Sequence, residues 1–196
     1  MAKLFHLDNP IWIFLGKLTD MVILTILWMA CCIPLVTVGA STAALYDVSI
    51  KLADNQEGYI ISSFFRSFRK NWKKGTAVWA AALLFGVFLI SDFYLYSRMG
   101  GTAGVVLLAS AGMLGIIYLM TLAYLFPFLI LYDMDFGHML ALAFVTALKN
   151  PGWTLLMVVA AAGIAAVGIF VMAPVLIISA GLTAYIHAKI LGIVVK

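Results

Sequence analysis

Four long runs of this chain contain no Asp, Glu, Lys or Arg: residues 21–46, 75–91, 99–132 and 150–188. A helix needs about 20 apolar residues to cross the hydrocarbon core of a bilayer. The last run has 39 residues and is long enough for two crossings. Because 65% of the chain is hydrophobic and 10% is charged, a soluble fold could not cover its surface with polar groups. The sequence therefore predicts an all-α, polytopic helical membrane protein.

Proline and glycine residues divide the four runs into about six transmembrane helices. Pro34, Gly100-Gly101 and Ala173-Pro174 would each lie at a turn between two helices. The chain would then be a single integral membrane domain of three helical hairpins, over residues 13–53, 76–131 and 152–194. The alternative has five spans, with residues 20–53 forming one broken crossing.

A short internal repeat supports this division. Asn9-Pro10-Ile11-Trp12 and Asn150-Pro151-Gly152-Trp153 match at three of four positions. At nearly the same distance after each comes a proline, Pro34 or Pro174, and then a helix of small residues that contains a tyrosine. Both ends of the chain are thus predicted to be hairpins, each entered through a surface segment that ends in asparagine and tryptophan.

Three further segments are predicted to be amphipathic interfacial helices on the cytoplasmic side. In the second of them, Phe64, Phe65, Phe68 and Trp72 recur at helical spacing with basic residues between them. Such a pattern is typical of a helix that lies on a membrane surface or against a partner. The three segments cover residues 1–12, 62–74 and 138–149.

The basic residues predict the orientation of the chain. With three hairpins, eleven of the twelve lie on or near one side, and only Arg98 lies opposite. The positive-inside rule makes the first side cytoplasmic, so both termini are expected there. Five spans would put Lys3 and Lys17 outside, which favours six. A basic cluster beside a span marks the cytoplasmic side and does not indicate a nucleic-acid partner.

The sequence contains no recognisable catalytic, cofactor or metal motif. No phosphate-binding G-x-x-x-x-G-K-[ST] segment and no G-x-S-x-G or H-E-x-x-H hydrolase motif occurs. The three histidines are far apart, and the adjacent Cys31 and Cys32 lack further metal ligands. Asp47 precedes Lys51 by one helical turn, so an ion pair explains both without an ion-coupling role. We therefore expect a protein that is not an enzyme and binds no cofactor.

Small residues predict close helix packing near the C-terminus. Ala180, Ala184 and Ala188 recur every four positions, which lets helices approach closely in lipid. Their partner can be another helix of this chain or another subunit, and the pattern does not distinguish the two. The candidate partner interface comprises Phe65, Phe68, Trp72, Ala180, Ala184 and Ala188.

Three segments resemble the YesL-like family of bacterial membrane proteins. Residues 28–46, WMACCIPLVTVGASTAALY, resemble the N-terminal signature of that family, and residues 65–72, FRSFRKNW, and 147–151, ALKNP, also fit it. The most specific part is Pro34-x-x-Thr37-x-Gly39. The structural motif residues are thus Pro34, Thr37, Gly39, Tyr46, Asn150 and Pro151. Thr25 departs from the family pattern, which leads us to expect an asparagine ahead of the tryptophan.

The resemblance implies a small protein of the bacterial inner membrane that is associated with carbohydrate uptake. Such proteins occur beside binding-protein-dependent ABC importers and sensor histidine kinases, and the family supplies no catalytic residues. The expected function is a non-enzymatic accessory protein of a carbohydrate ABC importer or its sensor. The alternative is an independent transporter of a small solute such as a sugar. The expected partners are the lipid bilayer and an importer permease or sensor kinase.

Overall fold

The computed structural model describes residues 10–54, 58–170 and 173–194, and every regular element within them is a helix. The predicted all-α class is therefore confirmed. The predicted lead-in over residues 1–9 and residues 55–57 of the polar loop lie outside the described parts. The elements are α1 (Pro10–Cys32), the short 3-10 turn η2 (Leu35–Thr37), α2 (Val38–Ala53), α3 (Ile60–Ser97), α4 (Gly101–Leu131), α5 (Phe136–Lys149), α6 (Pro151–Phe170) and α7 (Ala173–Val194).

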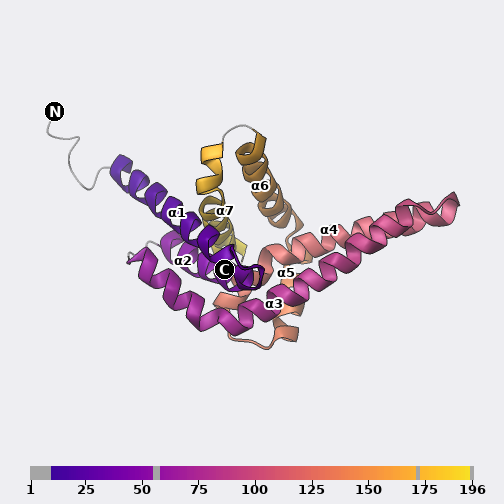
Figure 1. The fold of residues 1–196 in the computed structure, drawn as a ribbon, viewed down its shortest axis with the longest axis horizontal. Coiled ribbons are helices and arrows are strands. Elements are labelled where there is room, and N and C mark those ends of the chain that lie inside the picture. Colours follow the sequence, from indigo (N-terminus) through magenta and orange to yellow (C-terminus); the bar gives the residue numbers. More distant parts are fainter. Residues whose placement is uncertain (1–9, 55–57, 171–172, 195–196) are drawn as a thin grey trace.

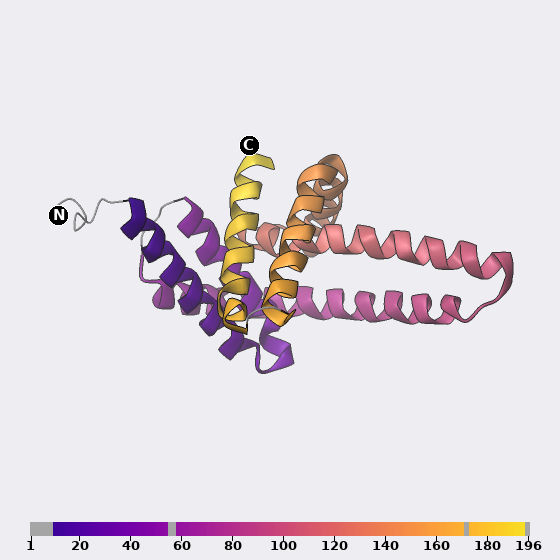
Figure 2. The same ribbon diagram turned by 90° about the horizontal axis from the view of Figure 1, so that it is seen from above.

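Consecutive long helices pack in pairs: α1 with α2, α3 with α4, and α6 with α7 (Figure 1). Figure 2 shows α3 and α4 running side by side away from the other helices, so that this pair projects from the molecule. In the described parts, four helices are long and apolar enough to cross a membrane, or five if the bent α5–α6 pair is one span. Six crossings stay a prediction.

The core lies where α2 is enclosed by α1, α3 and α7. The buried face of α2 consists mostly of small side chains, among them Ala40, Ser41, Ala43 and Ala44, which are fully buried. Small residues let helix backbones approach closely, and van der Waals contact then stabilises the pair without a hydrophobic driving force in lipid. The chain thus folds around its second helix rather than around a cavity.

The predicted surface helix over residues 62–74 is not a separate element. It continues without interruption through Gly75 into the span that follows, giving a helix of 38 residues, or about 57 Å at 1.5 Å per residue. Figure 1 shows that its axis changes direction between its basic first part and the part that pairs with α4. One glycine costs a helix only about 1 kcal/mol, so Gly75 does not end it.

The turn between α1 and α2 packs against α3. Gly39 lies so close to Gly75 that a Cβ atom on Gly39 would be 2.1 Å from the Gly75 carbonyl oxygen. This turn therefore lies beside the basic part of α3, and hydropathy carries no signal for that pairing. Because α1 and α2 are each long and apolar enough to cross a membrane, the hairpin over 13–53 stays a prediction.

Candidate functional site

The proline–threonine–glycine motif fastens the turn between α1 and α2. The Thr37 hydroxyl donates to the Pro34 carbonyl oxygen at 2.7 Å and also contacts the Cys31 carbonyl oxygen. The Trp79 indole of α3 donates to the Leu35 carbonyl oxygen at 3.1 Å. The turn is thereby joined to α1 on one side and to α3 on the other. The motif has a structural role, because each of these polar contacts is within the chain.

A buried histidine joins three helices. The Nε2 atom of His187 in α7 lies 3.0 Å from the Met157 carbonyl oxygen of α6, and its Nδ1 lies 2.8 Å from the Tyr46 hydroxyl of α2. A carbonyl oxygen only accepts, so Nε2 carries a proton. Burial disfavours a charged ring, so Nδ1 accepts from the Tyr46 hydroxyl. His187 thus bonds through both nitrogens and joins α2, α6 and α7.

Thr25, where the family pattern predicts asparagine, also has a partner. Its hydroxyl oxygen accepts a hydrogen bond of 2.9 Å from the Gly181 backbone amide of α7 and donates to the Met21 carbonyl oxygen at 2.8 Å. Gly181 is required here, since a Cβ atom would lie 2.5 Å from the Met21 carbonyl oxygen. The hydroxyl of Thr25 is therefore sufficient to join α1 to α7.

The Asn150-Pro151 pair marks the start of α6, as the repeat predicts. Pro151 occupies the first helical position, where no backbone donor is needed. The Thr154 hydroxyl donates to the Asn150 carbonyl oxygen at 2.8 Å and lies 3.0 Å from the Tyr124 hydroxyl of α4. These contacts join the beginning of α6 to the end of α4.

The alanine series of α7 is used within the chain. Ala184 and Ala188 are buried, and Ala180 packs against the core. Helix α7 packs against α1, α2 and α6. The structure thus places Ala184 and Ala188 inside the molecule, where another subunit could reach them only if the helices separated, and leaves Ala180 partly buried.

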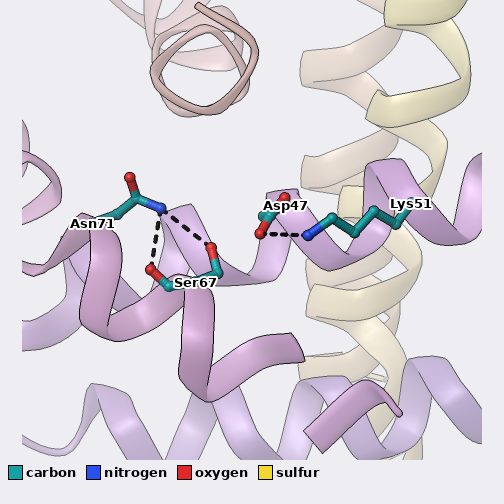
Figure 3. A network of polar contacts seen from close by, with 4 residues as sticks. All are labelled: Asp47, Lys51, Ser67 and Asn71. Carbon is teal, nitrogen blue, oxygen red and sulfur yellow. Dashed lines mark hydrogen bonds and ion pairs between the residues drawn. The ribbon is translucent and has the colours of Figure 1, made fainter. Parts of the chain in front are cut away.

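The side chains of the first part of α3 lie on two faces of the helix, one buried and one exposed. Phe64 and Asn71 are buried, and Figure 3 shows the Asn71 amide donating to the Ser67 carbonyl and hydroxyl oxygens, at 3.1 and 3.2 Å. Phe65 and Trp72, in contrast, have 44% and 41% of their surface exposed. Phe68 lies between the two faces, and its ring meets that of Trp72 edge-on. We call the side formed by Phe65, Arg66, Arg69, Trp72 and Lys73 the aromatic-basic face.

Two ion pairs form at the surface, and the sequence predicts one of them. Lys51 bonds to Asp47 at 3.0 Å (Figure 3), which confirms the predicted pair one turn apart. Lys74 of α3 pairs with Asp133, just before α5. The Lys74 ammonium holds the pKa of the Asp133 carboxyl below its usual value. No group of three or more potential metal ligands occurs among residues 10–54, 58–170 and 173–194.

One surface feature is not evident from the sequence. Helices α3, α4 and α5 enclose an apolar groove of about 620 Å³. Phe85 of α3, Leu114 of α4 and Phe144 of α5 are among its lining residues. The hydroxyl of Tyr118, which also lines it, is already bonded to the Ala82 carbonyl oxygen at 2.7 Å. Each helix contributes ordinary apolar residues, so no single segment predicts the groove.

Comparison with known proteins gives two matches, one to a family model and one to a single protein. Residues 21–93 match the model of a family described as "Protein of unknown function, DUF624". The chain is similar to the uncharacterized protein YesL of Bacillus subtilis (strain 168), with 26% identity over 151 residues. The alignment covers 76% of this chain and 71% of that protein. No solved structure gives a significant match.

Proposed function

Because both matches confirm that this chain belongs to a YesL-like family, we propose that it is a non-enzymatic accessory protein that binds a carbohydrate ABC importer or its sensor histidine kinase in the bacterial inner membrane. The class of partner rests on the association that the family resemblance implies. The capacity to bind rests on the aromatic-basic face of α3. A membrane location is supported independently by the long apolar helices.

The aromatic-basic face is the observation that carries the proposal. One side of the first part of α3 is buried at Phe64, Ser67 and Asn71, and α3 packs extensively against α2. The other side leaves Phe65 and Trp72 exposed among basic residues, where they contribute little to the core of the chain. Tryptophan and arginine are enriched among the residues that dominate binding energy at interfaces. A rigid helix with such a face is suited to contact the cytoplasmic part of a membrane protein.

The buried polar groups support an accessory role over a transport role. The side chains of Thr25, Tyr46 and His187 bond to other groups of the chain and join neighbouring helices. A solute pathway would instead present polar groups to a cavity, whereas the groove between α3, α4 and α5 is apolar.

We place both termini in the cytoplasm and Arg98 outside. Arg98 lies at the tip of the α3–α4 pair, and the basic part of α3 lies at its other end. The positive-inside rule then puts the tip outside. Lys189 near the end of α7 donates to the Ala53 carbonyl oxygen at the end of α2, at 2.7 Å. This contact supports a common side for the C-terminal ends of both helices.

Accessibility of single cysteines tests this orientation. In a Cys31→Ala, Cys32→Ala background, an impermeant thiol reagent added to intact cells should label Gly101→Cys but not Ala2→Cys or Gly137→Cys. With six crossings, Val36→Cys at the turn between α1 and α2 should be labelled as well. Protection of Val36→Cys would mean that α1 and α2 do not cross the membrane, and labelling of Ala2→Cys would support five crossings.

Affinity purification of the full-length chain from its native membrane tests the proposed partner. We expect an importer permease or a sensor histidine kinase to be recovered with it. The same protein, purified and reconstituted alone in liposomes, should transport no sugar. Robust sugar flux in those liposomes would contradict the accessory role and support an independent transporter.

A further inference from the structure

The groove between α3, α4 and α5 is shaped for hydrocarbon. Its volume of about 620 Å³ falls in the range of about 300–1,000 Å³ that is usual for small-molecule sites. The two hydroxyl groups among its lining residues are already used, by Tyr118 to Ala82 and by Thr121 to the Ile117 carbonyl oxygen. A ligand in the groove would therefore contact apolar side chains, so the groove would favour a ligand with an apolar part.

A cationic surface adjoins this groove along α3. Lys70, Lys74 and Val78 are spaced four residues apart, so they lie on one face of the helix, and Val78 lines the groove. Lys74 also borders a surface depression with His138 at the start of α5. The titratable groups around this end are Arg69, Lys70, Lys73, Lys74, Asp133, Asp135 and His138. With neutral histidine, they carry four positive and two negative charges.

Apolar surface beside positive charge is the combination that an anionic phospholipid requires. Basic pockets between membrane helices on the cytoplasmic side bind anionic head groups. We propose that this chain binds an anionic phospholipid of the cytoplasmic leaflet, with its phosphate at Lys70 and at Lys74, which it would share with Asp133, and with one acyl chain in the α3–α4–α5 groove. The excess positive charge favours an anionic head group over a zwitterionic one.

This lipid site adjoins the proposed partner surface, because Lys70 and Lys74 border one surface depression together with Trp72. Phe65 lies about half a turn from Lys70 and Lys74 at 3.6 residues per turn. An acyl chain in the groove would therefore leave the part of the aromatic-basic face around Phe65 accessible. The inference does not depend on which protein, if any, binds that face.

Native mass spectrometry of the full-length chain tests the site. The protein is released from nanodiscs that contain equal amounts of phosphatidylglycerol and phosphatidylcholine, and the retained lipid is identified. We expect phosphatidylglycerol to be retained preferentially. The Lys70→Gln, Lys74→Gln variant should lower the ratio of retained phosphatidylglycerol to phosphatidylcholine about 30-fold, since it removes two cations near the phosphate. Ala81→Phe, which fills the groove, should lower the retention of phosphatidylglycerol itself.

Matched variants make the test specific. Lys149→Gln removes an exposed cation that borders neither depression, and Ala80→Phe adds an aromatic ring to an exposed position that does not line the groove. Both should retain phosphatidylglycerol as the wild type does. Equal retention of the two lipids, equal losses in these controls, or a bound polypeptide in place of lipid would each overturn the proposal.

Discussion

Replacing Gly39 with alanine is expected to destabilise the protein strongly. The added Cβ atom would lie 2.1 Å from the Gly75 carbonyl oxygen and 2.5 Å from the Trp79 Cβ atom. Neither neighbour is the flexible end of a side chain, so α2 and α3 would have to move apart. Overpacking of this kind costs about 3 kcal/mol, which corresponds to a decrease in Tm of about 6–12 °C for a chain of this size. Thermal unfolding of the purified protein in detergent measures the change.

Two other glycines provide the control for this prediction. Gly112 and Gly115 of α4 have no atom within 4 Å of an added Cβ atom. Alanine is favoured over glycine in helices by about 1 kcal/mol, so Gly112→Ala and Gly115→Ala should keep or slightly raise the Tm. A Gly39→Ala protein as stable as the wild type would show that α2 and α3 do not pack as described.

Replacing His187 with leucine is the second substitution with a large expected effect. It would leave the Tyr46 hydroxyl without its partner in the core and would remove the second hydrogen bond of the Met157 carbonyl oxygen, which also accepts from the backbone inside α6. A buried polar group left unpaired costs about 1–3 kcal/mol, so a loss of about that size is expected. The exposed His138→Leu serves as the control. Thermal unfolding in detergent should show a clearly lower Tm for His187→Leu alone.

The double variant Tyr46→Phe, His187→Leu tests the reason for that loss. It removes both the tyrosine hydroxyl and the histidine ring, so neither side chain is left with an unpaired polar group. The double variant should therefore be less destabilised than the sum of the two single variants, as is typical of groups that share a hydrogen bond. Additive effects would mean that Tyr46 and His187 do not interact.

The local features of this fold could be predicted from the sequence. Long uncharged runs indicate apolar helices because a membrane offers backbone groups no other partners. Proline at the first helical position marks the start of α6, and the spacing of Asp47 and Lys51 predicts their ion pair. Each of these features depends on residues within a few positions of one another.

The contacts that determine the arrangement of the helices could not be predicted in this way. Gly39 and Gly75 are recognisable as small residues, but neither segment carries a signal that predicts their contact. Tyr46 and His187 are 141 positions apart, and each alone is compatible with an interfacial or a buried position. The alanine series of α7 illustrates the same limit, since its spacing predicts close packing without distinguishing α1 and α2 from a separate subunit.

The aromatic-basic face provides the most direct test of the accessory role. A Phe65→Ser, Trp72→Ser variant should insert and fold as the wild type does, because both side chains are exposed. Trp153→Ser is the matched control, as Trp153 is 39% exposed and lies on α6. We expect affinity purification from native membranes to recover the importer permease or sensor kinase with the wild type and with Trp153→Ser, but much less of it with the double variant. Equal recovery with all three proteins, or no such partner with the wild type, would contradict the proposed function.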